Sequence, residues 1–310
     1  MNKFAHFIVH GKAATYIAAL LCIVVGIVQM VRDGAGYLQG SFVLLAYLLA
    51  GLLLVRTGRE LSLNGGKSTF AATLYFLGCA IAPRLSVDSF EEMVFLLLPA
   101  ALYVLLKTYR HRFSMGLYFL AFVLVGVACM LVPPLLWAMP LLVLCGAFME
   151  SLNGRTLLAA LWGLLCPYWV MVGVLFLTDR IGEVPLYLQS LSSPMAASRE
   201  LWSQPLVQGQ WVWMFLLIVP TCAMVWFNHA MRLQANASFR FIATAFVVMT
   251  IAALAIPSAC LALSPCLLLL GSLMGSVQFM DTTRRGWNIY LFFLLLMWVF
   301  LGGYVYGAIL

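Results

Sequence analysis

Long apolar runs separated by short polar segments recur along the whole chain. The clearest pair covers residues 135–149 and 156–177 and flanks the polar stretch 150–155. Each run approaches the roughly 20 residues that a helix needs to cross a bilayer. Neither run alternates polar and apolar residues as a barrel strand does, and a helix satisfies its backbone hydrogen bonds internally. The pattern therefore predicts a transmembrane helical hairpin.

The same pattern predicts an all-α, polytopic bundle of about eleven transmembrane helices, within a range of about ten to twelve. We expect 241–280 to contain two spans with a turn between Pro257 and Pro265, because it is too long for one crossing. All 310 residues then form one integral membrane domain. The predicted spans are 13–31, 37–55, 69–82, 93–106, 115–131, 135–149, 156–177, 211–227, the two within 241–280, and 289–310.

The connection 178–210 is the longest segment outside the predicted spans. Apolar residues recur at helical spacing at Ile181, Val184, Leu188 and Leu191. This spacing fits a helix lying on the membrane, so we expect an interfacial or re-entrant lid on the periplasmic side. Simple interfacial packing is the alternative.

The composition agrees with a membrane location. Hydrophobic residues make up 65% of the chain and charged residues 9%, whereas soluble domains usually contain about 25% charged residues. The eight cysteines lie in or beside apolar runs and form no Cys-x-x-Cys pair. We therefore expect neither a disulfide framework nor a metal site, and no cofactor.

The basic residues predict the orientation, because lysine and arginine gather in cytoplasmic loops. With the N-terminus cytoplasmic and the C-terminus periplasmic, most of the seventeen basic residues fall on the cytoplasmic side and seven of the ten acidic residues fall outside. The net charge of +7 then reflects topology, and no nucleic-acid partner is expected. The periplasmic exceptions are Arg32, Arg84, Arg180 and Arg199.

Ionisable residues are absent from the middle of the predicted spans. Ion-coupled transporters use such groups as relays or ion ligands, so the sequence argues against a pump. Candidate functional residues are therefore sought at the two membrane edges.

Two polar turns are expected at the cytoplasmic edge. If they meet, they form a site for an anionic lipid head group or a phosphate. The alternative is that they cap helices and anchor them at the interface. The residues are Glu150, Asn153 and Arg155 in the first turn, and Asp281, Arg284 and Arg285 in the second.

Carboxylates and arginines are expected together at the periplasmic edge. Such a group would suit a divalent metal and a lipid-linked phosphate, as in membrane glycosyltransferases that use polyprenyl-phosphate sugars. The alternative is a solvated acidic surface. For an enzyme, the catalytic candidates are Asp33, Glu91, Glu92 and Asp179, and the phosphate-binding candidates are Arg84 and Arg180.

Several short segments within the first 180 or so residues together form a recognisable sequence pattern. They are Arg59-Glu-Leu-Ser-Leu-Asn64, Tyr75-Phe-Leu, Pro134-Leu-Leu-Trp137, Glu150-Ser-Leu-Asn153-Gly-Arg155, Ala160-Leu-Trp-Gly163 and Cys166-Pro167-Tyr168. Together they resemble an uncharacterised family of inner-membrane proteins from the bacterial group that includes gut anaerobes and gliding bacteria. The resemblance implies a Gram-negative inner membrane and transfers no activity.

The sequence thus favours a multi-pass inner-membrane protein that binds lipid or serves as a subunit of an envelope assembly, without catalysis. Membrane lipids are the expected partners, and another envelope protein is a candidate partner through 178–210. A glycosyltransferase-like enzyme is the first alternative. A facilitative transporter is the second, and it would require a polar cavity through the bilayer.

Overall fold

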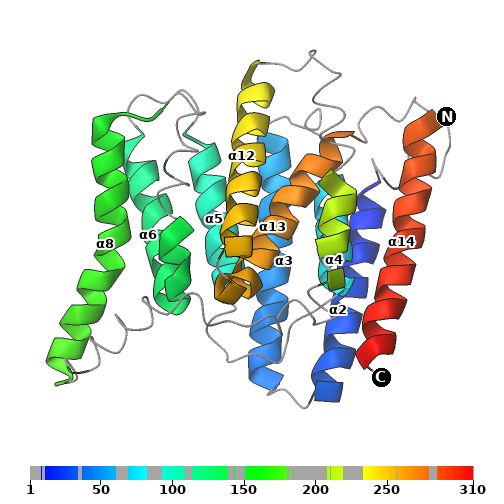
Figure 1. Cartoon of the computed structure of the whole chain (residues 1–310), viewed down its shortest axis with the longest axis horizontal. Helices are drawn as coiled ribbons and strands as arrows, with labels where there is room; N and C mark the ends of the chain where they lie inside the picture. The colour runs from blue at the N-terminus through cyan, green and yellow to red at the C-terminus, as the bar shows by residue number, and fades with distance from the viewer. Residues whose placement is uncertain are drawn as a thin grey trace.

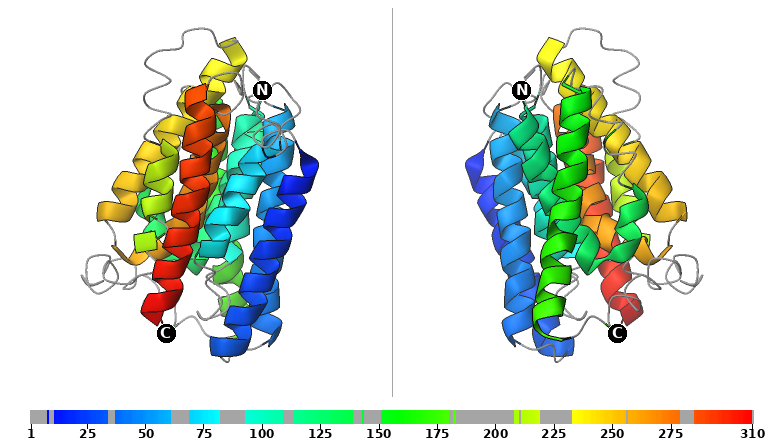
Figure 2. Two further views of the ribbon diagram at one scale, coloured as in Figure 1. Left: turned by 90° about the vertical axis from the view of Figure 1, so that its right-hand side faces the viewer. Right: turned by 90° about the vertical axis from the view of Figure 1, so that its left-hand side faces the viewer.

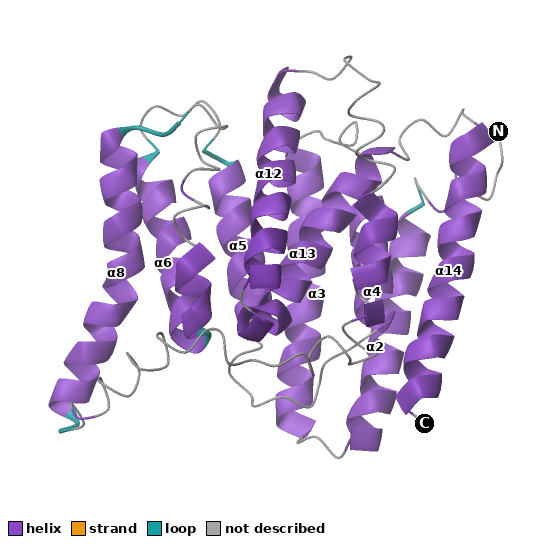
Figure 3. Cartoon of the chain, in the orientation of Figure 1, coloured by secondary structure: helices purple, strands orange, loops and turns teal. Residues whose placement is uncertain are grey.

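The structure is a computed structural model in which every described secondary-structure element is a helix (Figure 1, Figure 3). This confirms the predicted all-α fold class. The described residues are 8, 11–33, 37–60, 69–81, 93–108, 114–138, 143, 151–179, 182, 208–209, 211–218, 233–255, 257–278 and 285–309.

The helices lie side by side in one bundle, with α8 at one side and α14 at the other (Figure 1, Figure 2). Residues 211–218 are also helical. The bounds are α2 (Lys12–Asp33), α3 (Tyr37–Glu60), α4 (Phe70–Ile81), α5 (Val94–Leu106), α6 (Met115–Leu131), the 3-10 helix η2 (Pro133–Ala138), α8 (Gly154–Leu177), α12 (Leu233–Ala255), α13 (Pro257–Gln278) and α14 (Arg285–Ile309).

Helix α4 occupies the centre of the packing. Every residue of this helix except Leu77 is buried, and it contacts α2, α3, α13 and α14. A helix that is apolar on all faces can be surrounded in this way by other helices. The core of the bundle thus lies around α4.

Among the described residues, four helices are long and apolar enough to cross a membrane, and they indicate a membrane protein. They cover Lys12–Val31, Gly40–Gly58, Gly154–Leu177 and Ile289–Tyr306. The other apolar helices of the described part are shorter, between 10 and 17 residues. Of the eleven spans predicted from the sequence, these four meet the length and hydropathy expected of a span.

The break within 241–280 falls at Pro257 alone. Helix α12 ends at Ala255 and α13 begins at Pro257, where proline is well tolerated because the first helical N–H needs no partner. Pro265 lies inside α13, so the prediction that the turn extends to Pro265 was wrong. Pro99 and Pro167 also lie inside helices, α5 and α8, as membrane helices permit.

Candidate functional site

Every lysine or arginine whose side chain the structure describes lies at the same end of the bundle. Lys12 begins α2, Arg56 lies one turn before the end of α3, and Lys107 follows α5. Arg155 lies in the first turn of α8, and Arg240 lies near the start of α12. All five side chains are exposed. We call this the basic end; it is the upper end in Figure 1.

Asp179 is the acidic residue whose side chain is described, and it lies at the opposite end. It follows the last turn of α8, is exposed, and has a φ of 60°. The described charges therefore separate by sign between the two ends of the bundle.

Asn153 and Arg155 belong to the first predicted cytoplasmic turn. The Asn153 N–H donates to Thr156 Oγ1 at 2.7 Å, and Thr156 Oγ1 donates to the Asn153 carbonyl at 2.8 Å. Asn153 thus takes part in capping α8, which is the structural alternative considered for this turn. Glu150 lies outside the described residues.

The two predicted cytoplasmic turns each have one arginine that the structure describes, and these two arginines begin different helices. Arg155 lies at the start of α8 and Arg285 at the start of α14, and these helices stand at opposite sides of the bundle (Figure 1, Figure 2). This separation does not favour a head group shared by Arg155 and Arg285, and the predicted site as a whole stays a prediction. Asp281 and Arg284 lie outside the described residues.

The predicted periplasmic carboxylates are also divided. Asp33 ends α2 and Asp179 follows α8, so they share one end of the bundle but lie on different sides of it (Figure 1). In the described part, no three His, Cys, Asp or Glu side chains come close enough to hold a metal ion. Glu91, Glu92, Arg84, Arg180 and most of the predicted lid 178–210 lie outside the described residues.

A network of buried hydroxyl groups joins α5, α6 and α8 at the basic end. The Tyr118 and Ser151 hydroxyls are 2.9 Å apart, and Ser151 donates to Thr108 Oγ1 at 3.2 Å. Thr108 in turn donates to the Leu105 carbonyl at 2.7 Å. All three side chains are at most 1% exposed. Neutral, mutually bonded hydroxyls hold helix ends together and offer no acid or base to a substrate.

A second hydroxyl cluster joins α2 to α4 at the same end. Thr15 Oγ1 lies 2.6 Å from Thr69 Oγ1 and 3.0 Å from Thr73 Oγ1. Sequence reasoning missed both clusters because their members are single polar residues in separate apolar segments. The spacing of four residues between Thr73 in α4 and Thr69 just before it was the available signal.

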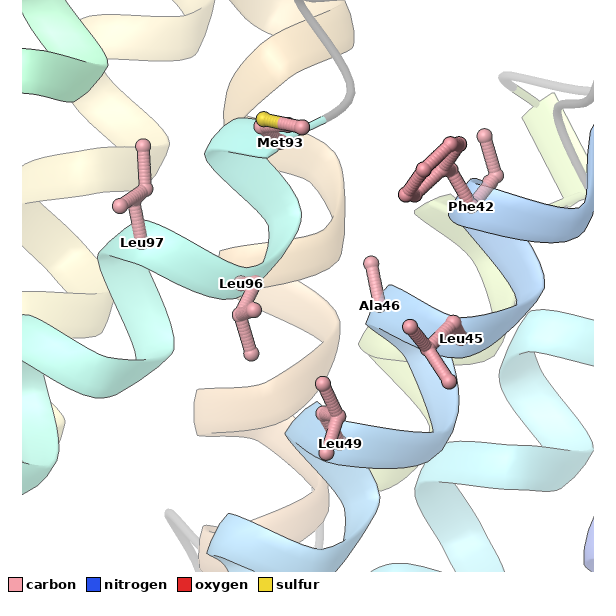
Figure 4. Close-up of a pocket in the computed structure, with 8 residues that line it drawn as sticks. Phe42, Leu45, Ala46, Leu49, Met93, Leu96 and Leu97 are labelled. Atoms are coloured by element: carbon pink, nitrogen blue, oxygen red, sulfur yellow. The ribbon is translucent and has the colours of Figure 1, made fainter. Parts of the chain in front are cut away.

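An apolar groove of about 250 Å³ opens between α3 and α5 (Figure 4). Val43 and Ala46 are buried at its base, whereas Phe42 is 56% and Leu45 52% exposed at its rim. Helix α13 contacts both α3 and α5. The lining residues are Phe42, Val43, Leu45, Ala46 and Leu49 from α3, with Met93, Leu96 and Leu97 at the start of α5.

The groove is a feature that sequence reasoning did not identify. Its residues belong to two apolar runs separated by α4, and nothing in either run marks the contact between them. The groove is open to the surroundings of the bundle and carries no ionisable side chain. It can therefore hold an apolar chain but cannot perform acid, base or nucleophilic chemistry.

The chain matches no family model, no curated protein and no solved structure. The resemblance to an uncharacterised inner-membrane family stays a prediction. The function must be argued from the groove and from the distribution of charge.

Proposed function

We propose that the chain is a multi-pass protein of a bacterial inner membrane that binds a lipid in the groove between α3 and α5 and performs no catalysis. The apolar lining of a groove open to its surroundings is the observation that carries this proposal. In the cell, the protein would serve as a lipid-binding protein or as a subunit of an envelope assembly.

The depth of the groove supports an acyl chain as its occupant. Its α3 residues lie within Gly40–Gly58 or next to it, and that segment is long and apolar enough to cross a membrane. At this depth the surrounding medium is hydrocarbon, and water would find no polar partners in the groove. Its volume of about 250 Å³ lies below the roughly 300–1,000 Å³ of pockets for drug-sized ligands. It therefore suits part of one chain.

The separation of the described charges is the reason for proposing a cytoplasmic N-terminus and a periplasmic C-terminus. The number of about eleven crossings stays a prediction. The five described basic side chains lie at the end where α2 begins, and Asp179 lies at the end where α14 terminates (Figure 1). Basic residues are retained on the cytoplasmic side of membranes. We therefore propose that the basic end faces the cytoplasm.

Lipid retention during purification tests the groove. Ala46→Trp adds a large side chain at the base of the groove, so the variant should lose most of the lipid that copurifies with the wild-type protein. Val299→Trp is the matched control, because Val299 is 64% exposed on α14, away from the groove. Lipid is counted by native mass spectrometry. Equal retention by both variants and the wild-type protein would exclude the groove as the binding site.

The glycosyltransferase alternative requires its carboxylates to converge. Asp33 ends α2 and Asp179 follows α8, and these two helices end on different sides of the bundle (Figure 1), so these two residues do not support a shared catalytic site. The transporter alternative requires a polar passage, and no observation on the described residues favours one. The groove therefore favours lipid binding over both alternatives.

A further inference from the structure

Helix α3 presents one continuous outward-facing row of residues. Phe42, Leu45, Leu49, Leu52 and Arg56 follow one another at alternating spacings of three and four. Residues with this spacing share one face of a helix, and all five are exposed. The row begins at the groove and ends with a positive charge at the basic end.

Helix α5 carries a matching row. Met93, Leu96, Ala100, Tyr103 and Lys107 follow the same alternating spacing, and Lys107 lies just beyond the last helical residue. Met93 faces Phe42 across the groove (Figure 4), and the two helices contact each other. The two rows therefore run in the same direction and in register.

The far ends of the rows meet at the ring of Tyr103. The Lys107 ammonium nitrogen lies 4.6 Å from the ring centroid, and the Arg56 guanidinium carbon lies 5.9 Å from it. Both distances fall within the roughly 6 Å range of cation–π attraction. A tyrosine flanked by long cationic side chains is typical of the boundary between head groups and hydrocarbon. Two like charges held at one ring also create a positive potential that attracts an anion.

The distance between the charges and the groove matches one leaflet. Arg56 lies two turns beyond Leu49 and four turns beyond Phe42, which is about 10 and 21 Å along the helix axis. One leaflet contributes about 15 Å of hydrocarbon. A lipid whose phosphate lies at Arg56 therefore places the end of its acyl chain near Ala46, inside the groove.

We infer that the α3–α5 surface binds an anionic glycerophospholipid of the cytoplasmic leaflet, with its phosphate at Arg56 and Lys107 and one acyl chain running to the groove. This inference rests on the proposed lipid-binding function and specifies the lipid class and leaflet. Arginine suits the role because its planar fork donates two parallel hydrogen bonds to a phosphate. A zwitterionic lipid gains less binding free energy from these two cations, since its own ammonium group offsets the phosphate charge.

The test compares phosphatidylglycerol with phosphatidylethanolamine of the same acyl composition, bound to the purified full-length protein. Apparent dissociation constants are measured by native mass spectrometry. For Arg56→Gln/Lys107→Gln we expect phosphatidylglycerol to bind on the order of tenfold more weakly, because each cation near the surface contributes separately. Phosphatidylethanolamine binding should change little, because its acyl chain still enters the groove.

The control variant is Arg155→Gln/Arg240→Gln, which removes two exposed cations of the same end from α8 and α12. It should keep the preference for phosphatidylglycerol. An equal loss of preference in both double variants would reduce the effect to general surface charge and overturn the inference. An unchanged preference in Arg56→Gln/Lys107→Gln would overturn it directly.

Ala46→Trp separates this inference from the proposed function. If the groove holds an acyl chain, Ala46→Trp weakens the binding of both lipids. Loss of both lipids in Ala46→Trp, together with unchanged preference in Arg56→Gln/Lys107→Gln, would leave the groove as a lipid site and reject the anionic head-group site. No effect of Ala46→Trp on either lipid would reject both.

Discussion

Gly163 of α8 lies directly against the backbone of Phe119 in α6. A Cβ atom added to Gly163 would stand 2.5 Å from the Phe119 carbonyl oxygen, and one added to Gly126 of α6 would stand 2.8 Å from the Leu164 carbonyl oxygen. The main chains of α6 and α8 therefore touch at two points, one at Gly163 and one at Gly126. Small residues at membrane-helix contacts permit such an approach and increase dispersion and Cα–H···O attraction.

Gly163→Ala should destabilise the protein. Alanine normally stabilises a helix by about 0.5–1 kcal/mol relative to glycine, but here its methyl group meets backbone that cannot rotate away. The net cost should be about 1–3 kcal/mol, measured as the change in the free energy of unfolding in mixed detergent micelles.

The control for this variant is Gly173→Ala on the same helix. A Cβ added to Gly173 has no neighbour within 4 Å, so this substitution should be neutral or stabilising. If Gly163→Ala matches Gly173→Ala, the close contact of α6 with α8 is contradicted.

The helix class and much of the helix placement followed from hydrophobic runs and proline positions alone. Residues 156–177 and 37–55 were predicted as spans, and α8 and α3 cover them. Such signals are local, because a membrane helix needs only a sufficient apolar length. Pro265 was misread because proline inside a membrane helix costs little when neighbours satisfy the freed backbone.

The lateral arrangement of the helices was not predictable from the same signals. A site joining Arg155 with Arg285 was one of two alternatives for this membrane edge, but edge position says nothing about neighbours within the membrane plane. The groove depends on which face of α3 meets α5, and both helices have apolar residues on every face. The depth of a residue in the membrane could therefore be predicted from the sequence, whereas the contacts between neighbouring helices could not.

The Tyr118–Ser151 pair should show energetic coupling. Tyr118→Phe and Ser151→Ala each remove one side of a buried 2.9 Å contact, and each should cost about 0.6–1.7 kcal/mol. The double variant should lose less than the sum, since the contact can be lost only once. The free energy of unfolding of the four proteins measures this coupling.

Tyr118→Phe paired with Thr250→Ala is the control cycle. Thr250 Oγ1 donates to the Phe246 carbonyl of its own helix at 2.8 Å, and it shares no contact with the network, so these two effects should add. Additive effects of Tyr118→Phe and Ser151→Ala would contradict the network.

Trp298 should hold α14 against α4. Its indole Nε1–H donates to the Leu77 carbonyl at 2.7 Å, and the nearby Tyr306 hydroxyl donates to the Ala80 carbonyl at 3.2 Å. The Ala80 carbonyl lies in the last turn of α4, where carbonyls lack helical partners. Trp298→Phe should therefore speed hydrogen exchange across α14 by about fivefold, as expected for a loss of about 1 kcal/mol.

Tyr304→Phe provides the comparison for α14. Its hydroxyl donates to Gln208 Oε1 at 3.0 Å, but Tyr304 is 53% exposed. An exposed hydrogen bond in the last turn of a membrane-spanning segment contributes less, because water at the membrane surface can replace the lost partner. Faster exchange in Tyr304→Phe than in Trp298→Phe would argue against α4 as the main support of α14.

The two ends of α8 should be accessible from opposite sides of the membrane. The helix has 24 residues and is therefore about 36 Å long, which exceeds the roughly 30 Å hydrocarbon core. Arg155 and Thr178 are exposed at its two ends.

With the eight native cysteines replaced by alanine, Thr178→Cys should react with a membrane-impermeant maleimide added to cells with a permeabilised outer membrane. Arg155→Cys should react only after lysis, because the proposed orientation places the basic end in the cytoplasm. Arg240→Cys, at the same end on α12, should behave like Arg155→Cys. The reverse pattern would invert the proposed orientation, and equal labelling of both ends of α8 would show that this helix does not span the membrane.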